Sequence, residues 1–328
     1  MAKRKRRTRR KKTPQETLSK ILAGFVGLLC LGSFLISWYN QYGGLPDWGH
    51  LMEGLDIART GVAEVPGDVL KNGTSVHFID VGQADSTLIL SGGVSCLVDA
   101  GDLDSAADLT AYLDMLDIQS IDYLVMTHPH ADHIGSMDDI LEDYPVGQVL
   151  LPDFELGPTP TSNIFNKVLT LINEKQIPTQ TMTQGASWTV GQGALQVVSG
   201  GVETDNYNNL SPVLKFTSPS LSLVLSGDGE TEVEQAALAS GGDLSADLFQ
   251  AGHHGSSTSN SLAFLQAIHP SVMVISCGLD NSYGHPHAET LENAAAVGAQ
   301  VFRTDQQGSI AVYRDGEGQL QVWTEKAA

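Results

Sequence analysis

Apolar and polar positions form short alternating segments along most of this 328-residue chain, which predicts a mixed α/β fold. Short, largely apolar runs indicate strands, and amphipathic segments between them indicate single helices. Strands are expected at residues 75–80, 86–90, 94–100, 123–126, 148–152, 187–190, 194–198, 212–216, 221–225, 246–251, 272–276, 301–303 and 310–313. Helices are expected at residues 105–116, 137–143, 163–175, 230–240, 261–268 and 289–297. Strand-rich stretches interleaved with single helices indicate two mixed sheets with helices on their outer faces.

The N-terminal segment has a different pattern. Residues 1–20 contain ten Lys/Arg and one acidic residue, and the next 18 residues, Ile21–Trp38, are uncharged, which is long enough for a short membrane-spanning helix. The basic block indicates a cytoplasmic N-terminus, and Trp38 and Tyr39 fit an interfacial aromatic anchor. We therefore expect a cytoplasmic tail (1–20), a single-pass transmembrane anchor in the cell membrane (21–39), a linker (40–73) and an extracellular globular domain (74–328). A cleaved signal peptide is the alternative, but no small-x-small cleavage site follows the apolar run.

Charge is distributed unevenly along the chain. Beyond residue 20 there are eight Lys/Arg against 37 Asp/Glu, a formal charge of −29, whereas the whole chain carries −20. So acidic a globular part is expected to be soluble and to repel polyanions at long range. The composition argues against tight, electrostatically driven binding of nucleic acid, because such binding depends on Lys and Arg contacts to phosphates.

Three cysteines do not make a disulfide framework. Cys30 lies in the apolar N-terminal run, and Cys96 and Cys277 lie in strand-like apolar segments. We expect Cys96 and Cys277 to be buried free thiols. A Cys96–Cys277 disulfide outside the cell is the alternative, and it needs a geometry that the sequence does not give.

Residues 121–136, IDYLVMTHPHADHIGS, hold the densest set of potential metal ligands. An apolar strand is expected to end at Thr127, and a loop then carries four potential ligands within six residues: His128, His130, Asp132 and His133. Ser136, after Gly135, is the expected N-cap of the next helix. Imidazole and carboxylate suit zinc, with manganese or iron as alternatives. Four ligands exceed what one tetrahedral ion takes from a short loop, so the pattern predicts two adjacent divalent ions; a His-rich surface loop without metal is the alternative.

Two later motifs also follow apolar strands. Asp228 ends the run LSLVLSGDG between two glycines, where its carboxylate could bridge two cations, and an ordinary Asp-Gly turn is the alternative. His253 and His254 follow the strand expected at 246–251. Adjacent residues point to opposite sides of a strand, so we expect one of the two histidines to bind the second ion and the other to contact a neighbour or the substrate. We assign the ion to His254, and His253 is the alternative.

The hydroxyl-rich segment after these histidines has two interpretations. Ser256 and Ser257, with Asn260, are expected at the start of a helix. The N–H groups of that helix could bind an oxyanion, or the serines could simply cap it.

These motifs carry a resemblance to a known family. THPHADHIGS resembles the H-x-H-x-D-H signature of metallo-β-lactamase-fold hydrolases. HFIDVGQADSTLIL, LVDAGD, LSGDGE, HHGSSTS and NSYGHPH occur in the order seen in the extracellular hydrolase domain of ComEC-type DNA-uptake proteins. The resemblance covers about Ser75 to Trp323. It implies a four-layer αββα sandwich in which Asp228 bridges two metal ions.

The resemblance also implies roles for residues beside the ligands. Asp99 matches the carboxylate that orients ligand histidines. His285 matches the YGHP histidine that faces the active site, where it binds a phosphoryl oxygen or protonates the leaving group. The turn before the metals also matches the family, at Asp80, Gln83 and Asp85, although Ala84 replaces a glycine. Many relatives supply a third histidine to the first ion, and at that position this chain has Asn209 or Ser211 instead.

The sequence therefore predicts a membrane-tethered, extracytoplasmic, metal-dependent hydrolase and favours a phosphodiesterase. Asp132 and His285 are expected to be catalytic, and two zinc or manganese ions to be the cofactors. The substrate is DNA, as the resemblance implies, or a smaller cell-surface phosphodiester such as a teichoic-acid substituent, which the acidic composition favours. With one apolar span, the chain would need a membrane channel partner to act in DNA uptake.

Two other functions stay open. One is a non-catalytic DNA-uptake or channel partner subunit, against which the intact ligand motifs argue. The other is a β-lactam or lactone hydrolase, which the missing third histidine and the YGHP motif disfavour.

Overall fold

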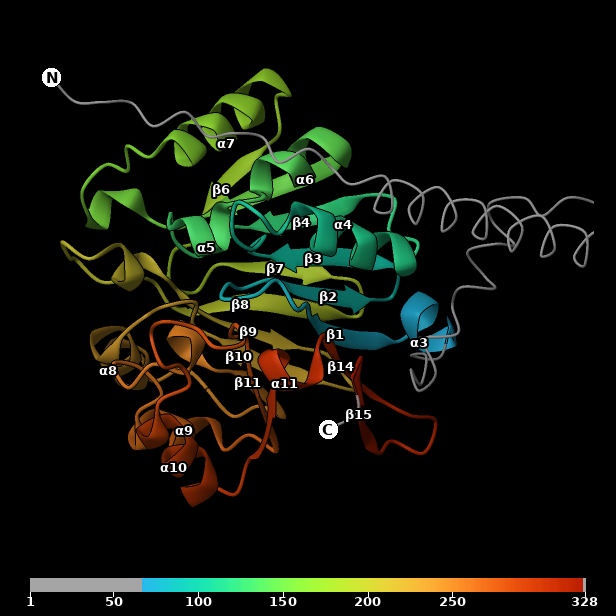
Figure 1. Cartoon of the computed structure of the whole chain (residues 1–328), viewed down its shortest axis with the longest axis vertical. Helices are drawn as coiled ribbons and strands as arrows, with labels where there is room; N and C mark the ends of the chain where they lie inside the picture. The colour runs from blue at the N-terminus through green and yellow to red at the C-terminus, as the bar shows by residue number, and fades with distance from the viewer. Residues whose placement is uncertain (1–66, 327–328) are drawn as a thin grey trace, which may run out of the picture. The chain divides into compact units, whose positions relative to one another are not determined.

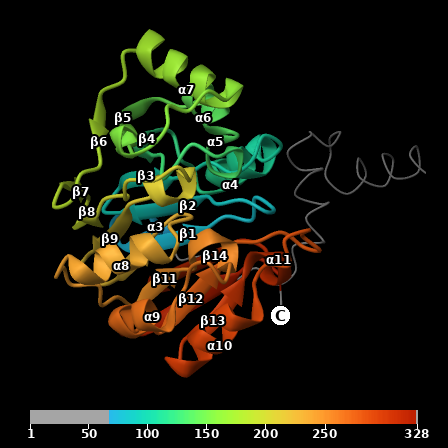
Figure 2. The same ribbon diagram turned by 90° about the vertical axis from the view of Figure 1, so that its left-hand side faces the viewer.

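The structure, a computed structural model, describes residues 67–326, whose strands form two sheets (Figures 1 and 2). The first sheet has eight strands in the spatial order β15 (Leu320–Thr324), β14 (Ile310–Arg314), β1 (Thr74–Phe78), β2 (Thr87–Ser91), β3 (Val94–Val98), β4 (Ile121–Val125), β5 (Val146–Leu151) and β6 (Thr179–Thr181). The second has seven, in the order β13 (Gln300–Arg303), β12 (Val272–Ile275), β11 (Leu248–Gln250), β10 (Ser222–Leu225), β9 (Val213–Thr217), β8 (Gly193–Ser199) and β7 (Ser187–Val190).

Both sheets are mixed. Strand β3 pairs antiparallel with β2 but parallel with β4, and β10 pairs antiparallel with β9 but parallel with β11. Parallel neighbours need crossover connections, and helices supply them. In the first sheet these are α4 (Ala106–Met115), α5 (Ala131–Ile134), α6 (Met137–Asp143) and α7 (Asn163–Glu174), and in the second α8 (Thr231–Ala239), α9 (Leu262–Ile268) and α10 (Ala288–Ala296).

Three apolar clusters produce four layers. One packs the first sheet against α4, α6 and α7, a second fills the space between the sheets, and a third packs the second sheet against α8–α10. Alternation along β9 shows why: Leu214 and Phe216 point between the sheets, whereas Val213 points toward the outer helices. Figure 1 shows α4–α7 on one side of the paired sheets and α8–α10 on the other. The expected two-sheet sandwich with outer helices is confirmed.

Elements that the apolar pattern predicted are present, with boundaries within two residues of those expected. The pattern missed β6, which is wholly exposed and polar, the edge strand β15, and elements too short for a period to show. The short elements are α3 (Gly67–Asn72), α5, α11 (Thr304–Gln307) and the 3₁₀ turns η2 (Phe154–Leu156), η3 (Tyr207–Leu210) and η4 (Gly252–Gly255).

Helix α3 lies within residues 40–73, the range expected to be a linker. Its Val69 and Leu70 pack against the first apolar cluster, so the end of that range belongs to the folded domain and is not a tether. The expected tail (1–20) and transmembrane anchor (21–39) lie outside the described residues. Among residues 67–326, no helix is long and apolar enough to cross a membrane.

The two cysteines of the described region are free and buried, as expected from their apolar surroundings. The alternative, a Cys96–Cys277 disulfide, is therefore not formed. Burial raises the pKa of each thiol to about 12, so both are protonated near neutral pH.

A fully buried histidine lies in the first sheet. His77 on β1 is within hydrogen-bond distance of the Ser75 hydroxyl (2.8 Å) and the Tyr112 hydroxyl (3.0 Å). Burial lowers the pKa of His77 to about 3, because the protonated ring cannot be solvated there. The folded protein therefore contains a neutral imidazole that the unfolded chain protonates near pH 6.5.

This difference predicts loss of stability in acid. Between pH 6.5 and about 3 the unfolded state binds one more proton at His77 than the folded state, so stability falls as the pH falls through that window. We expect His77→Gln to lower the melting temperature at neutral pH. In acid, the free energy of unfolding of this variant should fall less steeply than that of the wild type, by up to about 1.4 kcal/mol per pH unit. Thermal melts between pH 7 and pH 4 measure this, with exposed His269→Gln as control. Equal pH slopes for His77→Gln and wild type would contradict it.

Candidate metal centre

The candidate ligands lie at the carboxyl ends of strands from both sheets. The segment 127–135 follows β4, Asp228 follows β10, and residues 252–256 follow β11. Because β3 and β4 are parallel, and β10, β11 and β12 are parallel, these ends meet at one edge of each sheet. The two strand-end loops therefore face each other across the sandwich.

The loop after β4 is partly helical. His128 and His130 are in the loop, but Asp132 and His133 lie on the single helical turn α5, and not on an extended loop as the pattern predicted. Gly135 is required next, because a Cβ there would lie 2.2 Å from the carbonyl carbon of Asp102. Ser136 is at the N-cap position of α6, but its hydroxyl donates to the Asp102 carbonyl (2.6 Å) and does not cap the helix.

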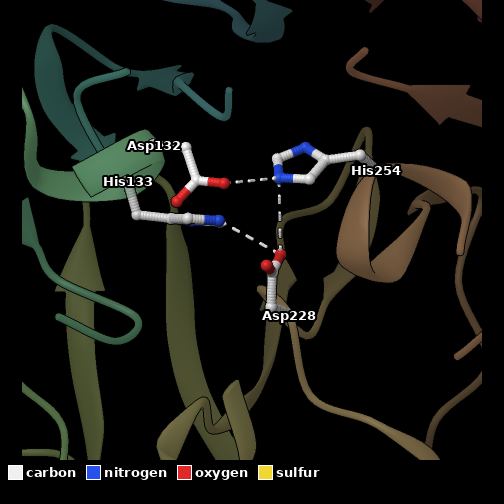
Figure 3. A group of neighbouring side chains, drawn as sticks. All are labelled: Asp132, His133, Asp228 and His254. Atoms are coloured by element: carbon white, nitrogen blue, oxygen red, sulfur yellow. Dashed lines mark ion pairs between the residues drawn. The ribbon is translucent and has the colours of Figure 1, made fainter. Parts of the chain in front are cut away.

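The structure brings all six expected ligands together in two groups that share one carboxylate. One group is His128, His130 and Asp228, and the other is Asp132, His133, Asp228 and His254; ligand atoms within each group lie within 4.8 Å of one another. Asp228 Oδ1 is 3.1 Å from His133 Nε2, and Asp132 Oδ2 is 3.3 Å from His254 Nε2. In Figure 3, α5 contributes Asp132 and His133 from one side and His254 comes from the other, with Asp228 reaching between them.

The backbone around Asp228 is constrained. Gly227 has φ +49°, and a Cβ there would lie 2.8 Å from the Thr127 side chain, so this close approach of the two loops requires glycine. The Asp228 N–H donates to the Ser211 hydroxyl (3.3 Å), which is also 3.3 Å from His128 Nδ1. Asp228 is thereby placed between the two groups, and this is more than an ordinary Asp-Gly turn.

The donor set fits two divalent cations. Three buried ligand atoms, namely His133 Nε2, Asp228 Oδ1 and His254 Nε2, lie 3.1–3.8 Å from one another or from Asp132 but make no well-formed hydrogen bond within residues 67–326. Unpaired polar atoms are costly to bury, and here they converge on the shared carboxylate. Imidazole and carboxylate together are the ligands of zinc and of similar divalent ions.

The electrostatics of the centre also favour cations. Burial alone would raise the pKa of Asp228, but the His133 and His254 rings hold that pKa well below its usual range. Although burial opposes protonation, Asp228 and Asp99 raise the pKa of His133, and Asp228 and Asp85 raise that of His254. Burial and the neighbouring His133 lower the pKa of His128, which keeps its ring neutral and able to ligate.

Two further carboxylates, Asp99 and Asp85, lie beside ligand histidines, and of these the resemblance implied the orienting role only for Asp99. Asp99 accepts the Thr127 N–H (2.9 Å) and lies 2.7 Å from His133 Nδ1, which directs His133 Nε2 to the centre. Asp85 Oδ1 is 3.4 Å from His254 Nδ1, which also lies 3.1 Å from the Ser276 carbonyl. Both rings are therefore turned with Nε2 toward Asp228.

The segment carrying His253 and His254 differs from the expected helix start. Both residues have left-handed backbones (φ +52° and +53°), and they belong to the 3₁₀ turn η4. Asn260 holds this segment closed: its side chain bonds Gly252 N–H (2.9 Å), Gly252 C=O (2.8 Å) and Ser256 C=O (3.0 Å).

Helix α9 begins at Leu262, one residue after the start expected from the apolar pattern, with Ser261 as the N-cap that accepts the Phe264 N–H. Ser256 hydrogen-bonds Thr258, and the Ser257 N–H donates to His287 Nδ1 (2.9 Å). The expected helix start at Ser256 and Ser257 is thus wrong, whereas oxyanion binding by this segment stays a prediction. The cause is local, because Asn260 is engaged within the loop and the helix cannot start before it.

A pocket of about 320 Å³ opens over the centre. It is lined by Gln83, His130, Ala131, Asp132, Asn208, Asp228, His253, His254, Tyr283 and His285. His253 reaches Asp228 Oδ2 at 3.6 Å and Thr258 at 3.1 Å, so it borders the centre beside the two groups. Gln83 accepts the Gly278 N–H (2.9 Å), and its amide nitrogen is 3.4 Å from His285 Nδ1.

Three predicted site residues lie away from this pocket. Asp80 pairs with Lys326 (3.1 Å) beyond its rim. Asn209 accepts the Glu230 N–H (2.9 Å), so Ser211, and not Asn209, is the residue that contacts His128. Ser256 is held within its own loop.

The pocket also contains residues that sequence reasoning missed. Asn208, on the turn η3, lines it together with His130, whereas the neighbouring Asn209 does not. Tyr283 lines it although it is 66 % exposed. The only signal for Tyr283 was its place beside the YGHP histidine.

His285 is a neutral base at physiological pH. Burial, together with the charges of His254 and His253, lowers its pKa to about 4. Its ring is nearly parallel to those of His254 (6.3 Å between centroids) and Tyr283 (5.5 Å). A neutral imidazole in this position can donate one hydrogen bond to an oxyanion but carries no spare proton for a leaving group.

A family model, the metallo-beta-lactamase superfamily, matches residues 79–278, a range that includes all six candidate ligands of the centre. The chain belongs to the metallo-beta-lactamase superfamily. This confirms the resemblance drawn from its motifs.

Relatives of this superfamily member include ComEC-type proteins. ComE operon protein 3 of Bacillus subtilis (strain 168) is 29% identical over 76% of this chain and 34% of its own length. Recombination protein 2 of Haemophilus influenzae is 30% identical over 72% of this chain and 28% of its own length. The chain thus spans about a third of the length of these relatives. A solved metallo-beta-lactamase fold protein, YhfI from Bacillus subtilis, is 12% identical with a TM-score of 0.49, covering 70% of this chain and 96% of that one.

Proposed function

We propose that this protein is a metal-dependent phosphodiesterase of the ComEC-like type, anchored in the membrane by residues 21–39 with its catalytic domain outside the cell. The observation that carries the proposal is the position of Asp228, whose carboxylate belongs to two ligand groups at once. A carboxylate shared by two groups suits a pair of divalent ions, zinc or manganese. When bound, such a pair would polarise a phosphoryl group and lower the pKa of a metal-bound water, so that hydroxide is available near neutral pH.

The chain's own residues supply the rest of the site. Asp99 and Asp85 keep His133 and His254 in the orientation that ligation needs. His285 is neutral and borders the pocket, where it would donate a hydrogen bond to a phosphoryl oxygen. Asp132 lines the pocket and also belongs to the ligand group of His133 and His254, which supports a catalytic role.

The residues that line the pocket indicate which kind of phosphodiester it can bind. No Lys or Arg of residues 67–326 lines it, so this part of the chain offers a polyanion no Lys or Arg side chain beside the metals. This supports a short or single phosphodiester as the group that is hydrolysed. The names of the relatives, among them Competence protein ComA of Neisseria gonorrhoeae, support DNA as its source, with a membrane channel as the partner.

Metal content measured together with activity tests the proposal. We expect about two equivalents of zinc or manganese, hydrolysis of bis-p-nitrophenyl phosphate, and no hydrolysis of nitrocefin. Single-stranded DNA is assayed in parallel. Hydrolysis of nitrocefin alone would assign a lactam hydrolase, and a metal-free protein inactive on all three would assign a non-catalytic partner subunit.

A further inference from the structure

Tyr283 is an aromatic residue that the fold does not need for packing. Its side chain is 66 % exposed, yet it lines the same pocket as Asp132, Asp228 and His254. Its ring is stacked on His285 with 5.5 Å between centroids and 21° between planes. A flat aromatic surface is thus presented at the mouth of the metal centre.

The loop that carries this ring is held firmly. Asn281 accepts the His285 N–H (2.9 Å) and donates to the carbonyls of His285 (2.7 Å) and Gly278 (2.9 Å). His287 Nε2 lies 3.3 Å from the Tyr283 carbonyl, and Gln83 accepts the Gly278 N–H. Ligand binding would therefore cost little ordering of the loop, because the ring is already placed.

A second, independent feature of the wall indicates a ligand. Asn208 is 8% exposed and lines the pocket beside His130, but its Oδ1 makes no well-formed hydrogen bond with the residues that the structure describes. A buried acceptor without a partner is costly unless a ligand supplies a donor. The wall therefore offers an aromatic face and a neutral acceptor, but no cationic side chain.

From these features we infer that Tyr283 and Asn208 form a ring-binding subsite, which takes the planar base of a nucleotide whose phosphate lies at the metal centre. Stacking on an aromatic side chain is tolerant of base identity, because every base has a π-face. The N–H groups on the edge of a base can satisfy Asn208 Oδ1. A glycerol phosphate polymer has neither a planar ring nor such N–H groups next to its phosphate. The subsite rests on the proposed function and narrows its substrate to nucleotidyl phosphodiesters.

A matched pair of ligands tests the subsite. Thymidine 5′-monophosphate and its abasic tetrahydrofuran analogue have the same charge and differ in the base, so the basic N-terminal segment affects both equally. Titration calorimetry on the full chain in detergent, loaded with zinc or manganese, measures both affinities. We expect the base to tighten binding roughly 5-fold to 100-fold, the range of base stacking on one aromatic ring.

Variants identify the residue responsible. Tyr283→Leu, which removes the flat ring but stays apolar, should bring the ratio of the two affinities close to one, and Tyr283→Phe should keep it. Leu279→Ala is the matched control, because Leu279 is 73% exposed on the same loop but does not line the pocket. Equal affinity of the wild type for the two ligands, a ratio unchanged in Tyr283→Leu, or no binding of either would overturn the inference.

A hydrolysis assay separates this inference from the proposed function. Thymidylyl-thymidine and its singly abasic analogue are hydrolysed in parallel, and Tyr283→Leu should lower kcat/KM only for the former. Base-dependent binding without hydrolysis would refute the phosphodiesterase and keep the subsite. Equal hydrolysis of both dinucleotides by wild type and by Tyr283→Leu would refute the subsite and keep the phosphodiesterase.

Discussion

Asp228→Asn is expected to reduce hydrolysis by about 10³-fold or more and to remove both metal ions, because one carboxylate serves both ligand groups. An amide carries no charge and cannot bridge two cations. The loss of the charge also leaves His133 and His254 without the counter-charge that raises the pKa of each ring. Metal analysis and turnover of bis-p-nitrophenyl phosphate measure the two effects.

A comparison with Asp132→Ala makes this prediction sharper. Asp132 belongs to one group only, so this variant should lose one equivalent of metal and most of the activity while keeping the ion at His128 and His130. Asp132→Ala should keep a melting temperature close to wild type in chelator. Asp243→Asn is the control, because Asp243 pairs with Lys215 and does not line the pocket over the centre. Retention of both ions and near-normal turnover by Asp228→Asn would show that the two-metal arrangement is wrong.

The ligand set was accessible to sequence reasoning for a physical reason. Metal ligands need a rigid support, and each ligand-bearing segment follows an apolar strand that is recognisable by its pattern. His128, His130, Asp132 and His133 are close in sequence, so their proximity in space needed no knowledge of the fold. Asp228 and His254 are distant, and the order of motifs resembling a known family was needed to bring them in.

Residues that depend on contacts far apart in the chain were beyond the sequence. Ser256 looked like a helix cap because serines precede an amphipathic segment, and nothing local indicated that Asn260 closes the loop. Buried Glu234 on α8 accepts the Asn260 N–H (2.5 Å) and Ser261 N–H (3.1 Å), and that contact sets where α9 begins. The choice between Asn209 and Ser211 likewise depended on how the turn η3 faces His128.

The fold and the chemistry of the centre do not by themselves determine the natural substrate. Charged residues outside the pocket also affect which phosphodiesters can bind. Residues 67–326 contain seven Lys/Arg, and five of them pair with carboxylates. These pairs are Lys167–Asp138, Lys215–Asp243, Arg303–Asp305, Arg314–Asp247 and Lys326–Asp80. A Lys or Arg paired with a carboxylate is partly neutralised and attracts phosphates less, so we expect the domain to bind a long polyanion weakly.

A chain lacking residues 1–39 is therefore expected to bind single-stranded DNA weakly, with a shallow salt dependence. Each phosphate contact contributes a slope of roughly −0.9 in log K against log salt, and a protein with six to ten contacts loses about 10³-fold to 10⁵-fold in affinity between 50 and 200 mM salt. We expect less than about tenfold here, since few contacts are available. Fluorescence anisotropy across that range measures it. The full chain is the matched control, because its first 20 residues add ten Lys/Arg and should steepen the slope.

DNA cleavage by the truncated chain should need a basic partner or high divalent-metal concentration, whereas a small phosphodiester should be hydrolysed without either. Tight DNA binding by the truncated chain that falls steeply with salt would make a dedicated nuclease the better assignment.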